Sequence, residues 1–112
     1  MQGLSFQWQL EGLVLAVLSR GPLHGYAIAT ELRQRSGGAL DVAEGTLYPV
    51  LHKLEKEGLI RSRWEVVNGR RRRVYASSPT AGGAVRERFE SWRRLSGAID
   101  SVFVSAPEAA GE

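Results

Sequence analysis

The chain has 112 residues, a formal net charge of +3, 43% hydrophobic residues and no cysteine. This length fits one domain with a helical extension, and the absence of cysteine excludes disulfides, thiolate metal sites and cysteine nucleophiles. No apolar run approaches the roughly 20 residues of a membrane span, and the N-terminal MQGLSFQWQLEGL has no basic signal-peptide region. We therefore expect a cytoplasmic protein that has no membrane partner.

Apolar residues at helical spacing predict two helices at the start of the chain. The first covers residues 5–19 and the second residues 24–36, with Gly37-Gly38 as a C-terminal stop. Glu11-Gly12 lies in the middle of the first helix, and we expect it to loosen that helix.

A third helix is expected from about Asp41 to Gly58. Asp41 and Glu44 have the spacing of a capping box. One face of the helix forms a buried apolar stripe of Leu47, Val50, Leu51 and Leu54.

The opposite face of this helix has residue types that contact DNA. Thr46, near the helix start, is suited to hold a phosphate, and Tyr48 offers a hydroxyl to phosphate and a ring to a thymine methyl or sugar. His52 and Lys53 can reach base edges, and Lys56 completes the face. Taken alone, a helix face of this composition is more often an ordinary solvated surface.

A β-hairpin is predicted after the third helix. Residues 59–66 alternate loosely and predict a strand, with Trp64 expected in the core. Asn68-Gly69 is a strong signal for a two-residue hairpin turn, and residues 72–77 form the returning strand.

The hairpin carries a concentrated positive charge, from Arg61, Arg63 and the consecutive Arg70, Arg71, Arg72 and Arg73. Such a cluster adds little stability and repels itself, a cost that a phosphate backbone or a narrow minor groove would offset. The helix face and the hairpin together therefore favour double-stranded DNA as the partner.

A last helix is predicted over residues 80–104, with an apolar stripe too wide for a domain this small to cover. The expected partner of this stripe is a second copy of the chain. The predicted class is α+β, a winged helix-turn-helix of three helices plus a β-hairpin wing, with a long C-terminal dimerisation helix. The expected units are residues 1–78 for DNA binding, 79–104 for dimerisation and a disordered tail at 105–112.

Four motifs are spread over residues 13–95 of the chain: LVLAVLSRGPLHGYAIATEL (residues 13–32), GTLYPVLHKLEKEGLI (45–60), GRRRRVY (69–75) and FESWRRL (89–95). In these motifs the chain resembles the PadR family of bacterial transcriptional regulators, in its short form with a single C-terminal helix. The resemblance implies a homodimer that binds a palindromic operator, usually as a repressor. It also implies DNA contacts from the third helix and the wing, and dimerisation through the first and last helices.

The candidate DNA-contacting residues are Thr46, Tyr48, His52, Lys53, Lys56, Arg61, Arg63, Arg70, Arg71, Arg72, Arg73, His24 and Tyr26. For His24, capping or packing at a helix start is the competing interpretation. The candidate dimer-interface residues are Leu10, Val85, Phe89, Trp92, Leu95, Ile99, Val102 and Phe103.

A small-molecule effector is a further expectation from the resemblance. In drug-sensing PadR-like proteins, a tryptophan at the place that matches Trp92 lines a cavity at the dimer centre and stacks flat aromatic ligands. Phe6, Leu13 and Phe89 are the other candidate effector contacts. The plainer interpretation is that Trp92 is interface core. For Trp8, dimer packing and an exposed anchor both remain open.

Other functions have weaker support. His24 and His52 are on different helices without a cysteine or carboxylate cluster, so no metal site or cofactor is expected. The sequence has no nucleophile elbow and neither GxxxxGK[ST] nor GxGxxG, so we do not expect an enzyme. The alternative is a winged-helix dimer that binds a ligand or a protein and whose DNA binding is weak or lost.

Overall fold

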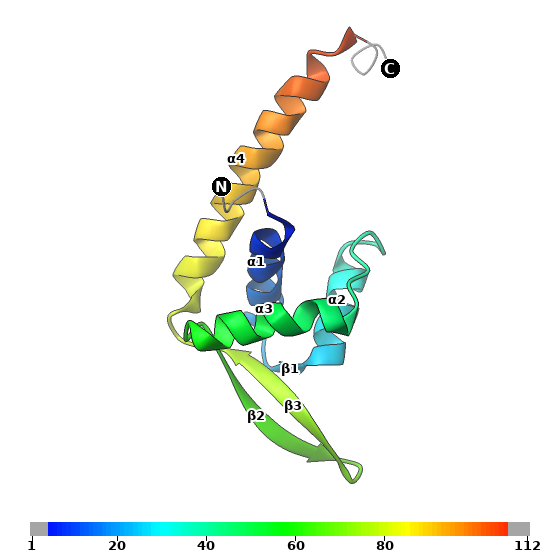
Figure 1. Cartoon of the computed structure of the whole chain (residues 1–112), viewed down its shortest axis with the longest axis vertical. Coiled ribbons are helices and arrows are strands. Elements are labelled where there is room, and N and C mark those ends of the chain that lie inside the picture. Colours follow the sequence, from blue (N-terminus) through cyan, green and yellow to red (C-terminus); the bar gives the residue numbers. More distant parts are fainter. Residues whose placement is uncertain (1–4, 108–112) are drawn as a thin grey trace.

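The computed structural model describes residues 5–107, which contain four helices and a three-stranded sheet. In chain order the elements are α1 (Phe6–Leu18), β1 (Leu23–His24), α2 (Gly25–Arg35), α3 (Glu44–Lys56), β2 (Ile60–Val67), β3 (Arg70–Ser77) and α4 (Ala81–Val104). The predicted α+β winged helix-turn-helix is confirmed. The hairpin wing projects from one end of the bundle formed by α1, α2 and α3, and α4 extends beyond the other end (Figure 1).

The first two helices begin at side-chain caps. The Ser5 hydroxyl accepts a hydrogen bond from the Trp8 amide at 3.0 Å, and His24 Nδ1 accepts one from the Ala27 amide at 3.4 Å. A cap of this kind satisfies an amide that has no partner within the helix. His24 therefore caps α2, which is the helix-start role that was the alternative to DNA contact.

The start of α3 differs from the prediction. Ala43 is the N-cap residue and supplies no side-chain hydrogen bond, so the capping box of Asp41 and Glu44 is wrong. Asp41 lies outside the helix, where its carboxylate is 3.8 Å from Arg33. Both of these side chains are exposed, so their contact contributes little to stability.

The sheet has the strand order β1-β3-β2, and all pairs are antiparallel. Asn68 (φ 53°) and Gly69 (φ 75°) form the predicted hairpin turn, in which both residues adopt the positive φ that a type I′ turn requires. β1 was not predicted, because its two residues, Leu23 and His24, are too few to show a period. It pairs with β3 at Tyr75 and Val74 and so attaches the start of α2 to the wing.

The core lies between α1, α2, α3 and the base of the sheet. Leu10 is 1% exposed and belongs to this core. Its assignment to the dimer interface is therefore wrong, because a side chain enclosed by its own chain cannot reach a partner. The other most deeply buried members are Val14, Leu15, Leu18, Ile28, Leu47, Val50, Leu54 and Ile60.

Helix α4 rests on α1 with its first turns only. Ala81 and Arg88 are buried and Val85 is half-buried against the core, whereas Phe103, near the far end, is 64% exposed. The far part of α4 lies beyond the rest of the molecule (Figure 1). The predicted tail at 105–112 falls, from residue 108 onward, outside the described residues. Within the described part, no helix has the length and apolar character needed to cross a membrane.

Candidate nucleic-acid interface

Helix α3 presents an exposed face beside the wing. Thr46, Tyr48, His52 and Lys56 are all exposed there, and the rings of Tyr48 and His52 lie 6.2 Å apart between centroids. The Thr46 amide donates to the Ala43 carbonyl at 3.0 Å. Because this amide is already engaged, the hydroxyl is the Thr46 donor that a phosphate at this helix start could use. This face has the donors and ring surfaces that groove contacts require.

Lys53 lies on a different side of α3 from the position predicted for it. Its Nζ donates to Glu11 Oε2 at 2.8 Å and lies 3.5 Å from Glu57 Oε2, so its side chain points toward α1. The hydrogen bond with Glu11 raises the pKa of Lys53, against the opposing effect of burial. The assignment of Lys53 to base reading is therefore corrected, because its ammonium group is already paired with the carboxylates of Glu11 and Glu57.

In the wing, Trp64 is exposed rather than buried. It is 54% exposed, and the guanidinium carbons of Arg71 and Arg73 lie 4.6 Å and 5.2 Å from its ring centroid. The core position predicted for Trp64 is wrong, because alternation along β2 turns its ring toward the arginines of β3. Cation–π contacts of this kind hold the guanidinium groups in a defined direction.

The wing is also tied to α3. Arg73 Nε donates to the Ser62 hydroxyl at 2.9 Å, and that hydroxyl donates to Glu55 Oε2. A guanidinium nitrogen of Arg73 lies 3.7 Å from the same carboxylate. The wing base therefore has a fixed orientation relative to the exposed face of α3.

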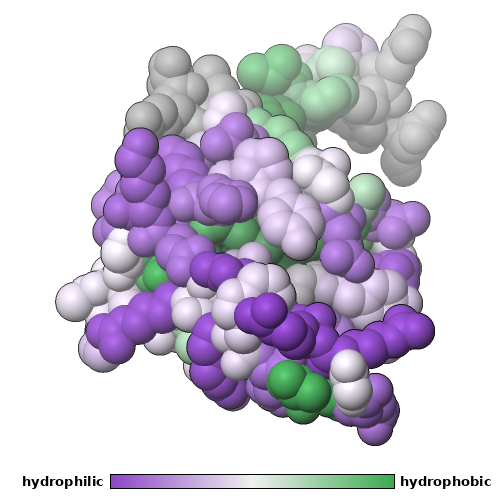
Figure 2. All heavy atoms as spheres, turned by 60° about the horizontal axis from the view of Figure 1, so that its bottom comes forward, coloured by the Kyte–Doolittle hydropathy of each residue, from purple (hydrophilic) through white to green (hydrophobic). Residues whose placement is uncertain are grey.

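Most of the wing arginines lack a carboxylate partner. Arg63 lies 3.6 Å from Glu65, and Arg73 is paired as described. Among the residues that the structure describes, no ion pair involves Arg61, Arg70, Arg71 or Arg72. Hydrophilic residues dominate the face seen when the wing end is turned forward (Figure 2). This uncompensated charge is available to a polyanion.

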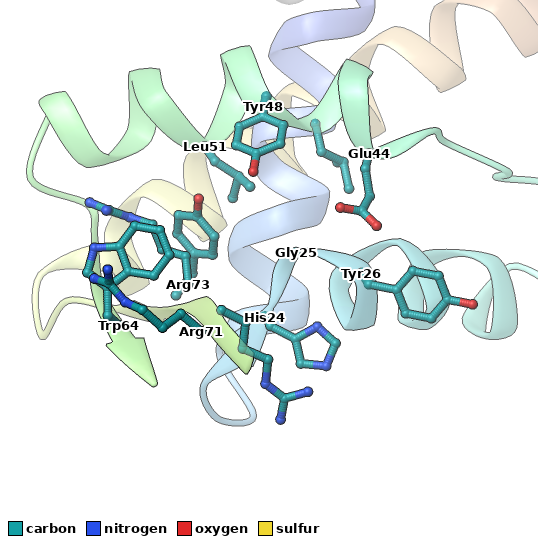
Figure 3. Close-up of a pocket in the computed structure, with 12 residues that line it drawn as sticks. His24, Gly25, Tyr26, Glu44, Tyr48, Leu51, Trp64, Arg71 and Arg73 are labelled. Atoms are coloured by element: carbon teal, nitrogen blue, oxygen red, sulfur yellow. The ribbon is translucent and has the colours of Figure 1, made fainter. Parts of the chain in front are cut away.

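A cleft of about 320 Å³ separates α3 from the wing and reaches the start of α2. Tyr48 on one side faces Trp64, Arg71 and Arg73 on the other, and His24 and Tyr26 lie at the α2 end (Figure 3). The rings of His24 and Tyr26 are stacked, with centroids 6.4 Å apart. The groove is thus lined by six of the candidate contacts: His24, Tyr26, Tyr48, Arg71, Arg72 and Arg73. The other candidates, Lys53 among them, are not lining residues of this groove.

Comparison with known proteins gives the family of the chain. The model of the family described as "Transcriptional regulator PadR-like family" matches residues 14–87. The chain belongs to this family. PadR-like proteins are transcriptional regulators, not enzymes.

The relatives of this PadR-like chain include proteins of known structure. The transcriptional regulator Rv3488 of Mycobacterium tuberculosis is 43% identical over 65 residues, which are 58% of this chain and 58% of that protein. A transcriptional regulator from Clostridium thermocellum has a TM-score of 0.76 at 26% identity, over 84% of this chain and 92% of that one. Bacillus subtilis PadR, solved in complex with operator DNA, has a TM-score of 0.63 at 24% identity, over 70% of this chain and 45% of that one. At that identity the likeness shows the fold.

A second cavity of the PadR-like chain lies between α1 and α4, with a volume of about 580 Å³. All four candidate effector contacts, Phe6, Leu13, Phe89 and Trp92, line it together with Arg88. The walls are mainly apolar, and the rings of Phe6, Phe89 and Trp92 are each about half exposed. This arrangement suits a flat apolar ligand or the side chains of a second copy.

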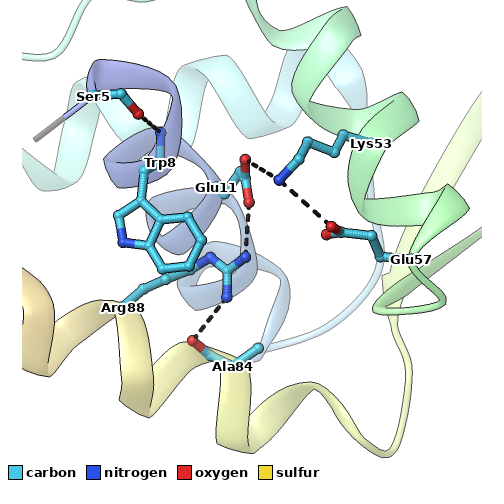
Figure 4. A network of polar contacts seen from close by, with 7 residues as sticks. All are labelled: Ser5, Trp8, Glu11, Lys53, Glu57, Ala84 and Arg88. Carbon is cyan, nitrogen blue, oxygen red and sulfur yellow. Dashed lines mark hydrogen bonds and ion pairs between the residues drawn. The ribbon is translucent and has the colours of Figure 1, made fainter. Parts of the chain in front are cut away.

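Sequence reasoning missed an ionic network behind this cavity, which we call the Glu11 network: Glu11, Lys53, Glu57 and Arg88 (Figure 4). Glu11 is 1% exposed and Arg88 is 6% exposed, and Arg88 donates to Glu11 Oε1 at 2.8 Å. The Arg88 guanidinium also lies 4.1 Å from the Trp8 ring centroid, so Trp8 packs within its own chain. The available signal was a single carboxylate among the apolar residues of the first helix, which has to find a cation when buried.

Proposed function

We propose that this PadR-like chain is a homodimeric, sequence-specific DNA-binding regulator in the cytoplasm, which represses a nearby operon from a palindromic operator. One observation carries the proposal: the exposed face of α3 lies beside wing arginines that have no carboxylate of their own. Tyr48 and His52 are the candidates for sequence reading, and Arg70 to Arg72 supply affinity for phosphate.

The homodimer is supported by the exposed apolar stripe of α4. Phe89, Trp92, Ile99 and Phe103 recur at helical spacing there, and each is at least 44% exposed. A continuous apolar stripe of this kind is stable in water when another helix covers it. A second copy related by a two-fold axis would also place two copies of α3 on two half-sites of an operator.

Regulation by a small apolar or aromatic effector is supported by the cavity between α1 and α4. It has the size and wall composition of ligand pockets, and Trp92 offers a face for stacking. A dimer bound over a promoter would cover DNA that RNA polymerase needs, so we propose that the protein represses transcription. We further propose that binding of the effector releases the dimer from the operator.

Binding to the DNA upstream of the chain's own gene tests the proposal, with affinities measured at several salt concentrations. Replacement of Arg70 to Arg73 by alanine should weaken binding to all duplexes and flatten the salt dependence, by about 0.9 in log–log slope for each phosphate that the variant no longer neutralises. A Tyr48→Phe or His52→Ala variant should instead change which sequences are preferred.

The matched control removes two arginines from α4, with Arg86→Ala and Arg94→Ala in one protein. Both residues are exposed and distant in sequence from the wing. This variant should keep the wild-type affinity and salt slope. If wild-type protein prefers no duplex over a scrambled one, the alternative holds: a ligand- or protein-binding winged-helix dimer whose DNA binding is weak or lost.

A further inference from the structure

The Glu11 carboxylate joins two helices that have different proposed roles. Its Oε1 accepts from Arg88 of α4 at 2.8 Å, and its Oε2 accepts from Lys53 of α3 at 2.8 Å. Helix α4 is the proposed dimerisation helix and α3 the proposed DNA-reading helix. One buried side chain on α1 is therefore bonded to both.

The packing makes this connection rigid on the α4 side. A Cβ added at Gly12 would lie 2.8 Å from Cβ of Arg88, so α1 and α4 are in close contact beside the carboxylate. Arg88 is further held by its hydrogen bond to the Ala84 carbonyl (3.4 Å) and by the Trp8 ring. Helix α1 also packs against α3, so α4 and α3 are connected both through α1 and through the Glu11 carboxylate.

We propose that Glu11, acting through Arg88 and Lys53, is a positioning residue that sets the orientation of the DNA-reading helix relative to the dimerisation helix. The inference rests on the proposed function, since it assumes a dimer formed through α4. In such a dimer, the angle between α3 and α4 fixes the separation of the two reading helices. The Glu11 network thereby determines which half-site spacing the protein accepts.

Half-site spacing is the readout that separates positioning from stability. One inserted base pair moves a half-site by about 3.4 Å and turns it by about 35°. Wild-type protein should discriminate against operators lengthened or shortened by one base pair by about tenfold, a common size of coupling between two sites. Lys53→Met, which leaves the buried Glu11–Arg88 pair intact, should reduce this ratio to about threefold or less.

Lys56→Met is the matched control. Lys56 is in the same last turn of α3 and is exposed, and no ion pair within residues 5–107 involves it. Loss of its charge should lower affinity by the same factor at every spacing and keep the tenfold ratio. If Lys53 were only a phosphate contact, Lys53→Met would show this uniform loss too.

A second readout needs no DNA. The chain has no cysteine, so His52→Cys provides one spin-labelling site per protomer on α3. Pulsed dipolar spectroscopy of the homodimer should give one narrow distance distribution for the otherwise wild-type protein. Adding Lys53→Met should broaden or shift it. Glu57→Gln, which removes only the second partner of Lys53, should not.

Glu11→Gln provides a second variant with the same side-chain shape, and it should broaden the distribution as Lys53→Met does. Either a retained wild-type spacing ratio or an unchanged distance distribution in Lys53→Met overturns the inference. An unlabelled wild-type protein that prefers no duplex over a scrambled one, together with a labelled protein whose distance distribution is sensitive to Lys53→Met, overturns the proposed function and keeps the positioning role. A labelled protein that is monomeric overturns both.

Discussion

Replacement of Gly12 by alanine tests the close contact between α1 and α4. In an open helix interior, Gly→Ala stabilises by about 1 kcal/mol, because glycine loses more backbone entropy on folding. At Gly12 the added methyl group would lie 2.8 Å from Cβ and 3.4 Å from Cδ of Arg88. Cβ is fixed to the backbone of α4, so relief requires the two helices to separate.

The expected net effect follows from the opposing contributions. Overpacking of this kind costs about 1–3 kcal/mol. Displacement of Arg88 also weakens its 2.8 Å contact with Glu11, and complete loss of a buried pair costs about 3–5 kcal/mol. With about 1 kcal/mol gained in helix propensity, we expect Gly12→Ala to reduce the free energy of unfolding by about 1–2 kcal/mol.

Urea unfolding measures this difference, at one protein concentration for all variants because dimerisation contributes to stability. The midpoint of Gly12→Ala should fall by about 0.5–1 M. The control is Gly97→Ala in α4, where an added Cβ meets nothing within 4 Å, and this variant should be up to about 1 kcal/mol more stable than wild type. If Gly12→Ala is as stable as wild type, the inferred closeness of α1 and α4 is refuted.

Three further predictions concern single side chains. The raised pKa of Lys53 means that its bond to Glu11 stabilises the fold fully below the ordinary value of 10.5 and is lost as pH rises through the folded-state pKa. Unfolding measured across that range should therefore show the advantage of wild type over Lys53→Met shrinking, whereas a constant difference would contradict the ion pair. Trp64→Ala should weaken duplex binding about fivefold, with a stability change below about 1 kcal/mol, because its exposed ring mainly orients Arg71. Trp64→Phe should keep most of the affinity, and equal losses in both variants would exclude an aromatic role. Planar aromatic compounds should quench the tryptophan fluorescence of wild type but not that of Trp92→Ala, and equal quenching would exclude the effector role of Trp92.

The main elements of the fold follow from local signals in the sequence. Helical periodicity locates α1 and α4, and Asn68-Gly69 marks the wing because few residue pairs adopt two positive φ values. Local signals failed at the start of α3, where the spacing of Asp41 and Glu44 fits a cap that the chain does not use. Spacing alone does not determine which residue carries the cap, since the path of the preceding loop decides that.

The candidate site was predictable where exposure follows from one helix or one strand. The face that contains Tyr48 and His52 follows from the helical wheel. Two of the errors arose where elements distant in the sequence meet. Leu10 and Lys53 occupy positions typical of a dimer stripe and a reading face, yet both are engaged by other parts of the same chain. Their surroundings depend on how α1 packs against its neighbours, which no local pattern specifies.

The Glu11 network also restricts which substitutions this sequence can accumulate in evolution. Loss of Arg88 alone would leave a carboxylate that is 1% exposed without its nearest buried cation, which is costly, whereas well-packed apolar replacements of a whole buried ionic set are often tolerated. Positions 11, 53 and 88 are therefore expected to change together in evolution. A descendant that carries leucine or methionine at all three would keep a packed interior, whereas an intermediate that had lost Arg88 alone would be destabilised by the buried Glu11 carboxylate.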